Sequence, residues 1–339
     1  MYTKLFEKSF YYAFIMTLVC SIIGSFLGGL PYLSIIGALV ISLILGMMFQ
    51  MYRPAIQKAE NGIGFISNKF LRLGIILLGF KLNLIDLANA GVKTILFAIF
   101  IVSGVIFLTY NIARKLGVSK RLAILTASGT GICGAAAVMG ISPQIKVSKE
   151  EETAKHNDEV LAVAIVAILG TVFTLIEIAL KPMLHMSATQ FGVMAGGSLH
   201  EIAHAIATGG AGGPVSLSAA IITKLSRVLL LAPAALVIGI WYQRSEKVNG
   251  GEKQKLPIPW FMAGFLMASI IGTFVPMSAT ILGLLVKLAY LVLGMAMAAL
   301  GMSVNFKAFL SSGRNAVIAA LSSSVVLLGF AIIVSKSFF

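Results

Sequence analysis

The chain has 339 residues, of which 58% are hydrophobic and only 11% are charged, and its mean hydropathy is +0.98. Because soluble domains carry about 25% charged residues, this composition excludes a soluble globular protein and indicates an all-α polytopic protein of the lipid bilayer. The net charge of +14 does not indicate a nucleic-acid partner, since basic residues in membrane proteins hold loops on the cytoplasmic side.

Eleven apolar stretches approach the roughly 20 residues that a membrane-crossing helix needs. In chain order they are 11–28, 33–50, 65–80, 92–112, 121–143, 158–180, 187–208, 215–243, 257–276, 280–303 and 314–336. The first follows Lys4 and Lys8 as a signal peptide would, but we expect it to be retained as a helix because many further spans follow. Connections between spans are short, so we expect one integral membrane domain over residues 1–339.

The basic residues between the spans predict an orientation. With eleven crossings and the N-terminus inside, 17 Lys and Arg fall on the cytoplasmic side and 6 on the outer side. Cytoplasmic segments are enriched in these residues. The distribution therefore predicts a cytoplasmic N-terminus and an external C-terminus.

A weak internal repeat joins two distant parts of the chain. "GFKLNLIDLANAG" (79–91) aligns without a gap with "GMSVNFKAFLSSG" (301–313), with two glycines and an asparagine in common. The copies end the third and the tenth span, and this odd separation reverses the direction of the second copy in the membrane. Inverted repeats are common in secondary transporters. We therefore expect one copy over about 11–145 and a second over about 158–336.

Two of the spans, 121–143 and 187–208, contain glycines that can interrupt a helix. These glycines are Gly129, Gly131 and Gly134 in the first span, and Gly196 and Gly197 in the second. Helices that break at membrane depth usually line a cavity, and a half-helix beginning near Gly134 would offer free N–H groups to an anion. The alternative is close packing of small residues between helices. Whether either span crosses the membrane or re-enters is left open.

Charged residues inside the spans are candidates for function, because each costs roughly 2.5–3.5 kcal/mol at a helix centre. Glu201 lies in the middle of its span, and Lys224 and Arg227 lie three residues apart on one face of the next span. Such charges line a polar cavity or pair with one another.

The stretch "HEIAH" contains His200, Glu201 and His204 in the spacing of zinc proteases. Catalytic zinc requires a third protein ligand, and the candidates Asp86 and Asp158 lie at span ends. Glu177 is a further candidate, but its position near the cytoplasmic end of the span 158–180 predicts that it lies at the membrane interface. A glutamate between two histidines also suits proton or cation handling in a transporter. An intramembrane zinc metalloprotease therefore stays as the alternative hypothesis.

Five segments together resemble the YeiH-type family of bacterial inner-membrane proteins, known as sulfate exporters. They are "LRLGIILLGFKLNL" (71–84), "SGTGICGAAAV" (128–138), "HEIAH" (200–204), "TKLSRVLLLAP" (223–233) and "PIPWFMAGF" (257–265). The family also resembles sodium/proton antiporters and bile-acid symporters. This resemblance implies inverted repeats, crossing broken helices and a panel domain that moves against a core domain. The chain departs from the family pattern at Gly131, where that pattern has Ser, and at His204, where it has Gln.

These observations favour a secondary transporter with alternating access that exports a small anion such as sulfate, without a cofactor. A channel is a further alternative. H⁺ or Na⁺ is expected as the coupling ion, and assembly into a homodimer is left open. The expected binding residues are Thr130, Gly131, Cys133, Gly134, His200, Glu201, His204, Lys224 and Arg227. Lys224 and Arg227 are expected either to neutralise the substrate or to hold Glu201 in an ion pair.

Overall fold

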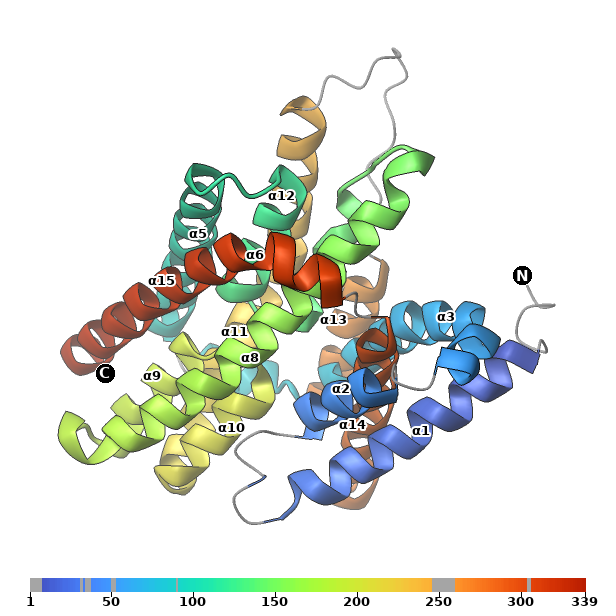
Figure 1. Ribbon diagram of the computed structural model, residues 1–339. Coiled ribbons are helices and arrows are strands. Elements are labelled where there is room, and N and C mark those ends of the chain that lie inside the picture. Colours follow the sequence, from blue (N-terminus) through green and yellow to red (C-terminus); the bar gives the residue numbers. More distant parts are fainter. Residues whose placement is uncertain are drawn as a thin grey trace. The chain divides into compact units, whose positions relative to one another are not determined.

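The computed structural model describes residues 8–30, 33, 38–49, 53–89, 91–245, 260–303 and 306–339. Helices dominate these ranges, which contain no strand. Figure 1 shows the course of these helices along the chain. By their internal contacts, the residues divide into two compact units. Unit 1 comprises Met1–Ile85 and Phe261–Asn305, and unit 2 comprises Asp86–Trp260 and Phe306–Phe339.

In the described residues, unit 1 is built from five α-helices, three before and two after the first segment of unit 2. They are α1 (Lys8–Gly28), α2 (Ala38–Phe49), α3 (Arg53–Leu78), α13 (Trp260–Phe274) and α14 (Ala279–Met302). α14 packs against α1, α2 and α3. Small residues allow this, since a Cβ on Gly46 of α2 would lie 2.9 Å from the Cα of Ala298 of α14. Close approach through small residues is how helices associate within a bilayer.

Unit 2 contains the remaining α-helices of the described residues, both long and short. They are α5 (Gly91–Lys115), α6 (Lys120–Gly131), α7 (Ala135–Ile141), α8 (Glu152–Leu184), α9 (Ala188–Ser198), α10 (Ile202–Ala211), α11 (Pro214–Leu229), α12 (Leu231–Ser245) and α15 (Phe306–Phe338), with the short α4 (Leu84–Asn89) at the unit boundary. α8 is in contact with α6, α7, α10 and α15. It therefore forms the support on which the short helices of unit 2 lie.

Seven helical segments in the described part of the chain are long and apolar enough to cross a membrane. They are Lys8–Gly28, Ile56–Lys81, Gly91–Lys115, Glu152–Leu184, Pro214–Ser245, Ala279–Met302 and Gly313–Phe338. Of the other predicted spans, 33–50 and 257–276 correspond to the shorter α2 and α13 and lie partly outside the described residues. The spans 121–143 and 187–208 are each divided into two short helices.

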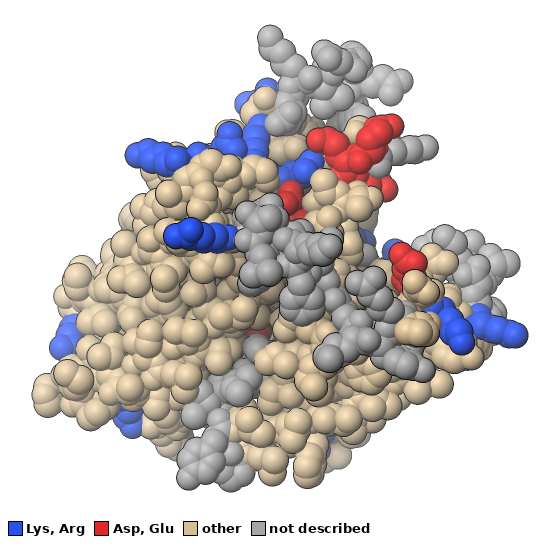
Figure 2. Space-filling model, in the orientation of Figure 1, with Lys and Arg blue, Asp and Glu red and all other residues tan. Residues whose placement is uncertain are grey.

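The surface has the character of a membrane protein. Large apolar side chains are exposed along the long helices. Examples are Phe26, Phe107 and Ile333, which are 70%, 72% and 66% exposed. Figure 2 shows broad uncharged areas, with an acidic group over the first turns of α8. Exposed apolar area on this scale indicates a lipid-facing surface. The composition-based prediction of a polytopic helical membrane protein is confirmed.

Candidate functional site

The first interrupted span breaks between α6 and α7. α6 begins after Ser119, whose hydroxyl accepts a hydrogen bond from the backbone N–H of Leu122, and it ends at Gly131. Gly134 has a φ of 67° and caps the N-terminus of α7. Glycine adopts this left-handed conformation without steric cost. The break occupies residues 132–134, and the second half-helix starts where the sequence predicted it.

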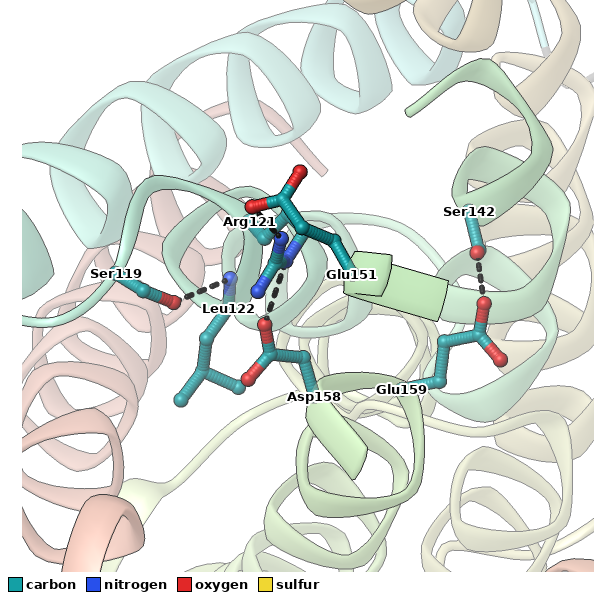
Figure 3. A network of polar contacts seen from close by, with 7 residues as sticks. All are labelled: Ser119, Arg121, Leu122, Ser142, Glu151, Asp158 and Glu159. Atoms are coloured by element: carbon teal, nitrogen blue, oxygen red, sulfur yellow. Dashed lines mark hydrogen bonds and ion pairs between the residues drawn. The ribbon is translucent and has the colours of Figure 1, made fainter. Parts of the chain in front are cut away.

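α7 folds back along α6 instead of continuing in the same direction. A Cβ on Gly129 of α6 would lie 2.9 Å from the side chain of Val138 of α7. Ser142, directly after α7, donates a hydrogen bond to the carboxylate of Glu159 near the start of α8 (Figure 3). The end of α7 is therefore held against the first turns of α8.

The start of α6 is held at the same place. Arg121 Nε lies 3.0 Å from Asp158 Oδ2, and Arg121 Nη1 lies 3.1 Å from Glu151 Oε1 (Figure 3). The start of α6 and the end of α7 therefore both lie beside the beginning of α8. The two helices form a helical hairpin, which we call hairpin 1.

The second interrupted span breaks between α9 and α10. α9 begins after Ser187, and Ser187 and Gln190 cap it reciprocally through side chain and backbone. The helix ends at Ser198, and α10 begins at Ile202 after the N-cap residue Glu201. The break therefore lies at residues 199–201.

The glycine pair predicted to cause this break lies inside α9 instead. A Cβ on Gly196 would lie 2.8 Å from the Cβ of Thr223 in α11, and one on Gly197 would lie 2.8 Å from the ring of Phe97 in α5. These glycines serve close helix packing, which is the alternative that the sequence also allowed. The span is interrupted as predicted, but the break lies at residues 199–201 and not at the glycine pair.

α10 returns to the end of α8 from which α9 departs. The ring of His204, near the start of α10, lies against Gly170 in the middle of α8. Lys181, in the last turn of α8, donates a hydrogen bond to the carbonyl of Ala211 at the end of α10. α9 and α10 therefore form hairpin 2, beside the second half of α8.

Two further contacts show which ends of α12 and α15 lie beside each hairpin. At the hairpin 1 end, Lys120 Nζ donates to Ser245 Oγ at the end of α12, over 2.6 Å. At the hairpin 2 end, Gln190 Nε2 lies 3.4 Å from the carbonyl of Lys336 in the last turn of α15. The two hairpins therefore approach each other from opposite ends of unit 2 (Figure 1).

Arg227 of α11 joins the tips of the two hairpins. Its Nε and Nη2 donate to the carbonyls of Thr130 and Gly131 at 2.7–3.2 Å, and its Nη1 donates to those of Gly197 (2.6 Å) and Leu199 (3.0 Å). A guanidinium has five N–H donors, and all five are used. The side chain is fully buried. Arg227 therefore stabilises the carbonyls that the ends of α6 and α9 leave without helical partners.

Lys224, one turn earlier in α11, completes this arrangement. Its ammonium group donates to the carbonyls of Ile132 (3.0 Å) and Leu199 (2.5 Å). An ammonium has three donors, so one N–H remains for a further acceptor. Within the described residues, neither Lys224 nor Arg227 forms an ion pair with Glu201. The expected ion pair is therefore replaced by contacts with backbone oxygens.

Glu201 lies at the other side of the first break. A Cβ on Gly134 would lie 3.0 Å from Glu201 Oε1, and the carboxylate lies beside the backbone N–H of Ala135 at the start of α7. Glu201 is 4% exposed, and neither carboxylate oxygen has a hydrogen-bond partner of normal geometry in the described part of the chain. The predicted anion position at the N-terminus of α7 therefore faces a carboxylate of the protein itself. The thiol of Cys133 is buried in the same break.

The two histidines of the "HEIAH" stretch do not share a helical face. His200 lies in the break, with its Nε2 3.0 Å from Ser324 Oγ of α15, whereas His204 lies in α10, with its Nε2 3.4 Å from Thr171 Oγ1 of α8. Zinc ligation by H-E-x-x-H requires both imidazoles on one helix. In the described ranges, no three His, Cys, Asp or Glu are grouped to hold a metal ion. The zinc hypothesis loses its geometric basis.

One residue of this region was not among the expected binding residues. Glu177 of α8 is fully buried, and it accepts a hydrogen bond of 2.6 Å from Ser198 at the end of α9. Its second carboxylate oxygen has no partner among the described residues. The sequence carried a signal, an acidic residue within an apolar span, but its position near a predicted span end suggested the membrane interface instead.

Comparisons with known proteins place the chain in a family of membrane proteins. A model of the family described as "Conserved hypothetical protein 698" matches residues 12–320. A "UPF0324 membrane protein" of Lactobacillus johnsonii is 58% identical over 98% of each chain. Relatives with the same description in Bifidobacterium longum and Bacillus cereus are 51% and 43% identical, over 94–96% of the chains compared. No solved structure matches the chain significantly.

Proposed function

We propose, from the premise that the chain belongs to the UPF0324 family of membrane proteins, the YeiH-type family, that it is a secondary transporter working by alternating access. The observation that carries this proposal is the meeting of two hairpins around Lys224 and Arg227. Irregular backbone at membrane depth is tolerated only where it is buried in protein or lines a cavity, and transporter sites are typically formed by such discontinuous helices near the bilayer midplane.

The hairpins support a topology of nine crossings instead of eleven. The nine are α1, α2, α3, α5, α8, α11 with α12, α13, α14 and α15. Hairpin 1 re-enters from the cytoplasmic side and hairpin 2 from the outer side. Nine is odd, so the proposed cytoplasmic N-terminus and external C-terminus are retained.

The distribution of basic residues supports this revised topology. The segment after hairpin 1, with Lys146, Lys149 and Lys155, moves to the cytoplasmic side, and Lys181 moves to the outer side. The ratio of inner to outer Lys and Arg rises from 17:6 to 19:4. A correct topology is expected to sharpen this bias. We place the protein in the bacterial inner membrane on the family resemblance.

The same topology supports an inverted repeat of a particular kind. In order along the first copy, α2, α3, α5, hairpin 1 and α8 correspond to α13, α14, α15, hairpin 2 and α11 with α12. Every pair then runs in opposite directions, and both members lie in the same unit. In the second copy, hairpin 2 and α11–α12 precede the other three elements. The repeat is therefore circularly permuted, unlike the simple division at 11–145 and 158–336.

The substrate that we propose is a small anion, with sulfate suggested by the family and export as the direction. Arg227 has no free N–H group, so it positions the hairpin tips. Lys224 retains one N–H group beside both breaks and is the candidate for direct contact with the anion. Glu201 is the candidate for carrying the coupling ion, because its carboxylate is buried next to the first break and accepts no hydrogen bond of normal geometry from the described residues.

The test is the transport of radiolabelled sulfate by purified protein in liposomes. We expect saturable flux that responds to an imposed ion gradient and is lost in the Lys224→Gln variant, with Lys287→Gln, at an exposed position of α14, as the matched control. Downhill flux that does not saturate would indicate a channel. Absence of flux for sulfate and for other small anions, under every gradient, would contradict the proposal.

A further inference from the structure

The tips of the two hairpins gather backbone carbonyls around one pair of side chains. Five carbonyl oxygens accept hydrogen bonds from the ammonium of Lys224 and the guanidinium of Arg227. They belong to Thr130, Gly131, Ile132, Gly197 and Leu199. In secondary transporters, unwound carbonyls and half-helix C-termini are the ligands that coordinate a coupling Na⁺. Here the chain's own cations already occupy this kind of oxygen site.

We propose, on the basis of the transporter function proposed above, that Lys224 and Arg227 are built-in cations in the place of a coupling Na⁺, so that transport is independent of Na⁺ and coupled to protons through Glu201. The oxygen site and the acidic group lie on opposite sides of the same break, residues 132–134. In this proposal, Lys224 and Arg227 neutralise the C-terminal ends of α6 and α9, and Glu201 binds and releases the coupling proton.

The balance of charge supports the first half of the proposal. Each helix C-terminus carries the equivalent of about −0.5 charge, and the ends of α6 and α9 meet at Lys224 and Arg227. Two full positive charges already compensate these ends. A Na⁺ among the same oxygens would be a third positive charge, and it would have to displace hydrogen bonds that use every donor of Arg227. We therefore expect this oxygen site to have no measurable affinity for Na⁺.

The surroundings of Glu201 support the second half. Glu201 is buried, its two oxygens accept no hydrogen bond of normal geometry from the described residues, and only the backbone N–H of Ala135 and the ammonium of Lys224 favour its charged form. Burial opposes the charge and these two groups favour it, so neither protonation state is fixed. A carboxylate in such a place can take up and release a proton as its access to water changes. Sodium would require several additional oxygen ligands at the same point, whereas the two side chains that interact electrostatically with Glu201, those of Lys224 and Cys133, offer nitrogen and sulfur.

The groups around Glu201 define what else can titrate. Lys224 of α11 and the thiol of Cys133, in the first break, interact electrostatically with it. His200 and His204 flank it in its own segment. Glu177 of α8 interacts with Lys224 and Arg227, on the other side of the hairpin tips. Among these groups, Glu201 is the carboxylate that lies against Gly134 in the first break, residues 132–134.

The first arm of the test measures thermal unfolding of the purified full chain in Na⁺ and in N-methylglucamine at equal ionic strength. We expect the wild-type Tm to be the same in both. Arg227→Ala should lower the Tm by about 5 °C or more, and Na⁺ or guanidinium ion should restore part of this loss by entering the vacated oxygen site. Arg244→Ala, at the exposed end of α12, is the matched control and should show neither effect.

Where Arg227→Ala does not yield folded protein, Lys224→Ala serves in its place, with methylammonium as the rescuing ion. A saturable rise of the wild-type Tm with Na⁺ would overturn the proposal. Failure of every cation to stabilise the Ala variant would also overturn it, because the carbonyls would then not form a cation site.

The second arm measures sulfate flux in liposomes under a pH gradient and, separately, under a Na⁺ gradient. Flux driven by pH and indifferent to Na⁺ is expected, and flux driven by Na⁺ would overturn the inference while supporting transport. Absence of sulfate flux would count against the proposed function and its substrate, whereas the Tm arm would still decide whether the oxygen site is filled by the chain's own cations.

Discussion

Gly170 leaves room on α8 for the imidazole ring of His204, which packs directly over it. A methyl group at this position would collide with ring atoms Cε1 and Nδ1. We therefore predict that Gly170→Ala destabilises the protein by about 1–3 kcal/mol, as overpacking of a filled interior does. Gly104→Ala in α5 is the control, because nothing lies within 4 Å of a Cβ there. Denaturant unfolding in detergent measures both.

A double variant tests whether the loss of stability in Gly170→Ala comes from the collision with the His204 ring or from a general defect of α8. Combining Gly170→Ala with His204→Ala removes the collision, so the double variant should regain stability relative to the sum of the two single changes. If the two changes add without interaction, the ring does not limit the space at Gly170.

A second prediction at the residue scale concerns the charge of Glu201. Glu201→Gln keeps the shape and removes the titrating group, so sulfate flux under a pH gradient should fall to the level seen without the gradient. Thermal stability should be unchanged or higher, because the amide carries no buried charge. Glu152→Gln, at an exposed position of α8, is the control. Full pH-driven flux in Glu201→Gln would remove this residue from the coupling step.

Single residues also show what could be predicted from the sequence and what could not. The break at Gly134 was predictable because closely spaced glycines surround it and a positive φ favours glycine. Gly196 and Gly197 carry the same signal but serve packing against α11 and α5, and a sequence alone does not distinguish the two uses. The carbonyl partners of Arg227 were beyond prediction, because backbone oxygens become ligands only once the hairpins meet.

At the scale of elements, hairpin 1 depends on how its base is held against α8. Arg121 is 17% exposed and binds Asp158 and Glu151 (Figure 3). We predict that Arg121→Gln costs about 1 kcal/mol, the upper range for a partly exposed pair, and that this cost shrinks at high salt. Hydrogen exchange at the start of α6 should accelerate, since this is where the hairpin loses its attachment.

The double variant Arg121→Gln with Asp158→Asn checks the assignment. Its loss of stability should be smaller than the sum of the single losses, because one interaction is removed in both. Arg244→Gln at the end of α12 should leave exchange in α6 unchanged. Faster exchange throughout unit 2, not confined to α6, would indicate that Arg121 stabilises the unit as a whole.

The reversal of direction within the two hairpins explains why the elements were only partly predictable. Hydropathy measures the length of an apolar stretch and not its direction, so α6 with α7 reads as one span although the chain turns back at residues 132–134. The loop charges carried the missing information. Counting Lys146, Lys149 and Lys155 as cytoplasmic and Lys181 as external sharpens the bias from 17:6 to 19:4, and this comparison requires no structure.

At the scale of the whole molecule, nine and eleven crossings predict opposite sides for two segments. Thr153 and Ala188 are exposed, at the start of α8 and of α9. With re-entrant hairpins, Thr153→Cys lies inside and Ala188→Cys outside, whereas eleven crossings reverse both. An impermeant maleimide applied to intact cells should therefore label Ala188→Cys and spare Thr153→Cys until the membrane is permeabilised. The native Cys20 and Cys133 are buried and give little background.

Two further positions calibrate this labelling, because both topologies assign them to the same side. Ser245→Cys, at the end of α12, should be labelled only after permeabilisation, and Ser337→Cys, in the last turn of α15, should be labelled in intact cells; both residues are exposed. Labelling of Thr153→Cys in intact cells, with these controls correct, would mean that α6 and α7 cross the membrane. The meeting of two hairpin tips from opposite sides would then fail as the basis of alternating access, because residues 132–134 and 199–201 would no longer be reached from different sides.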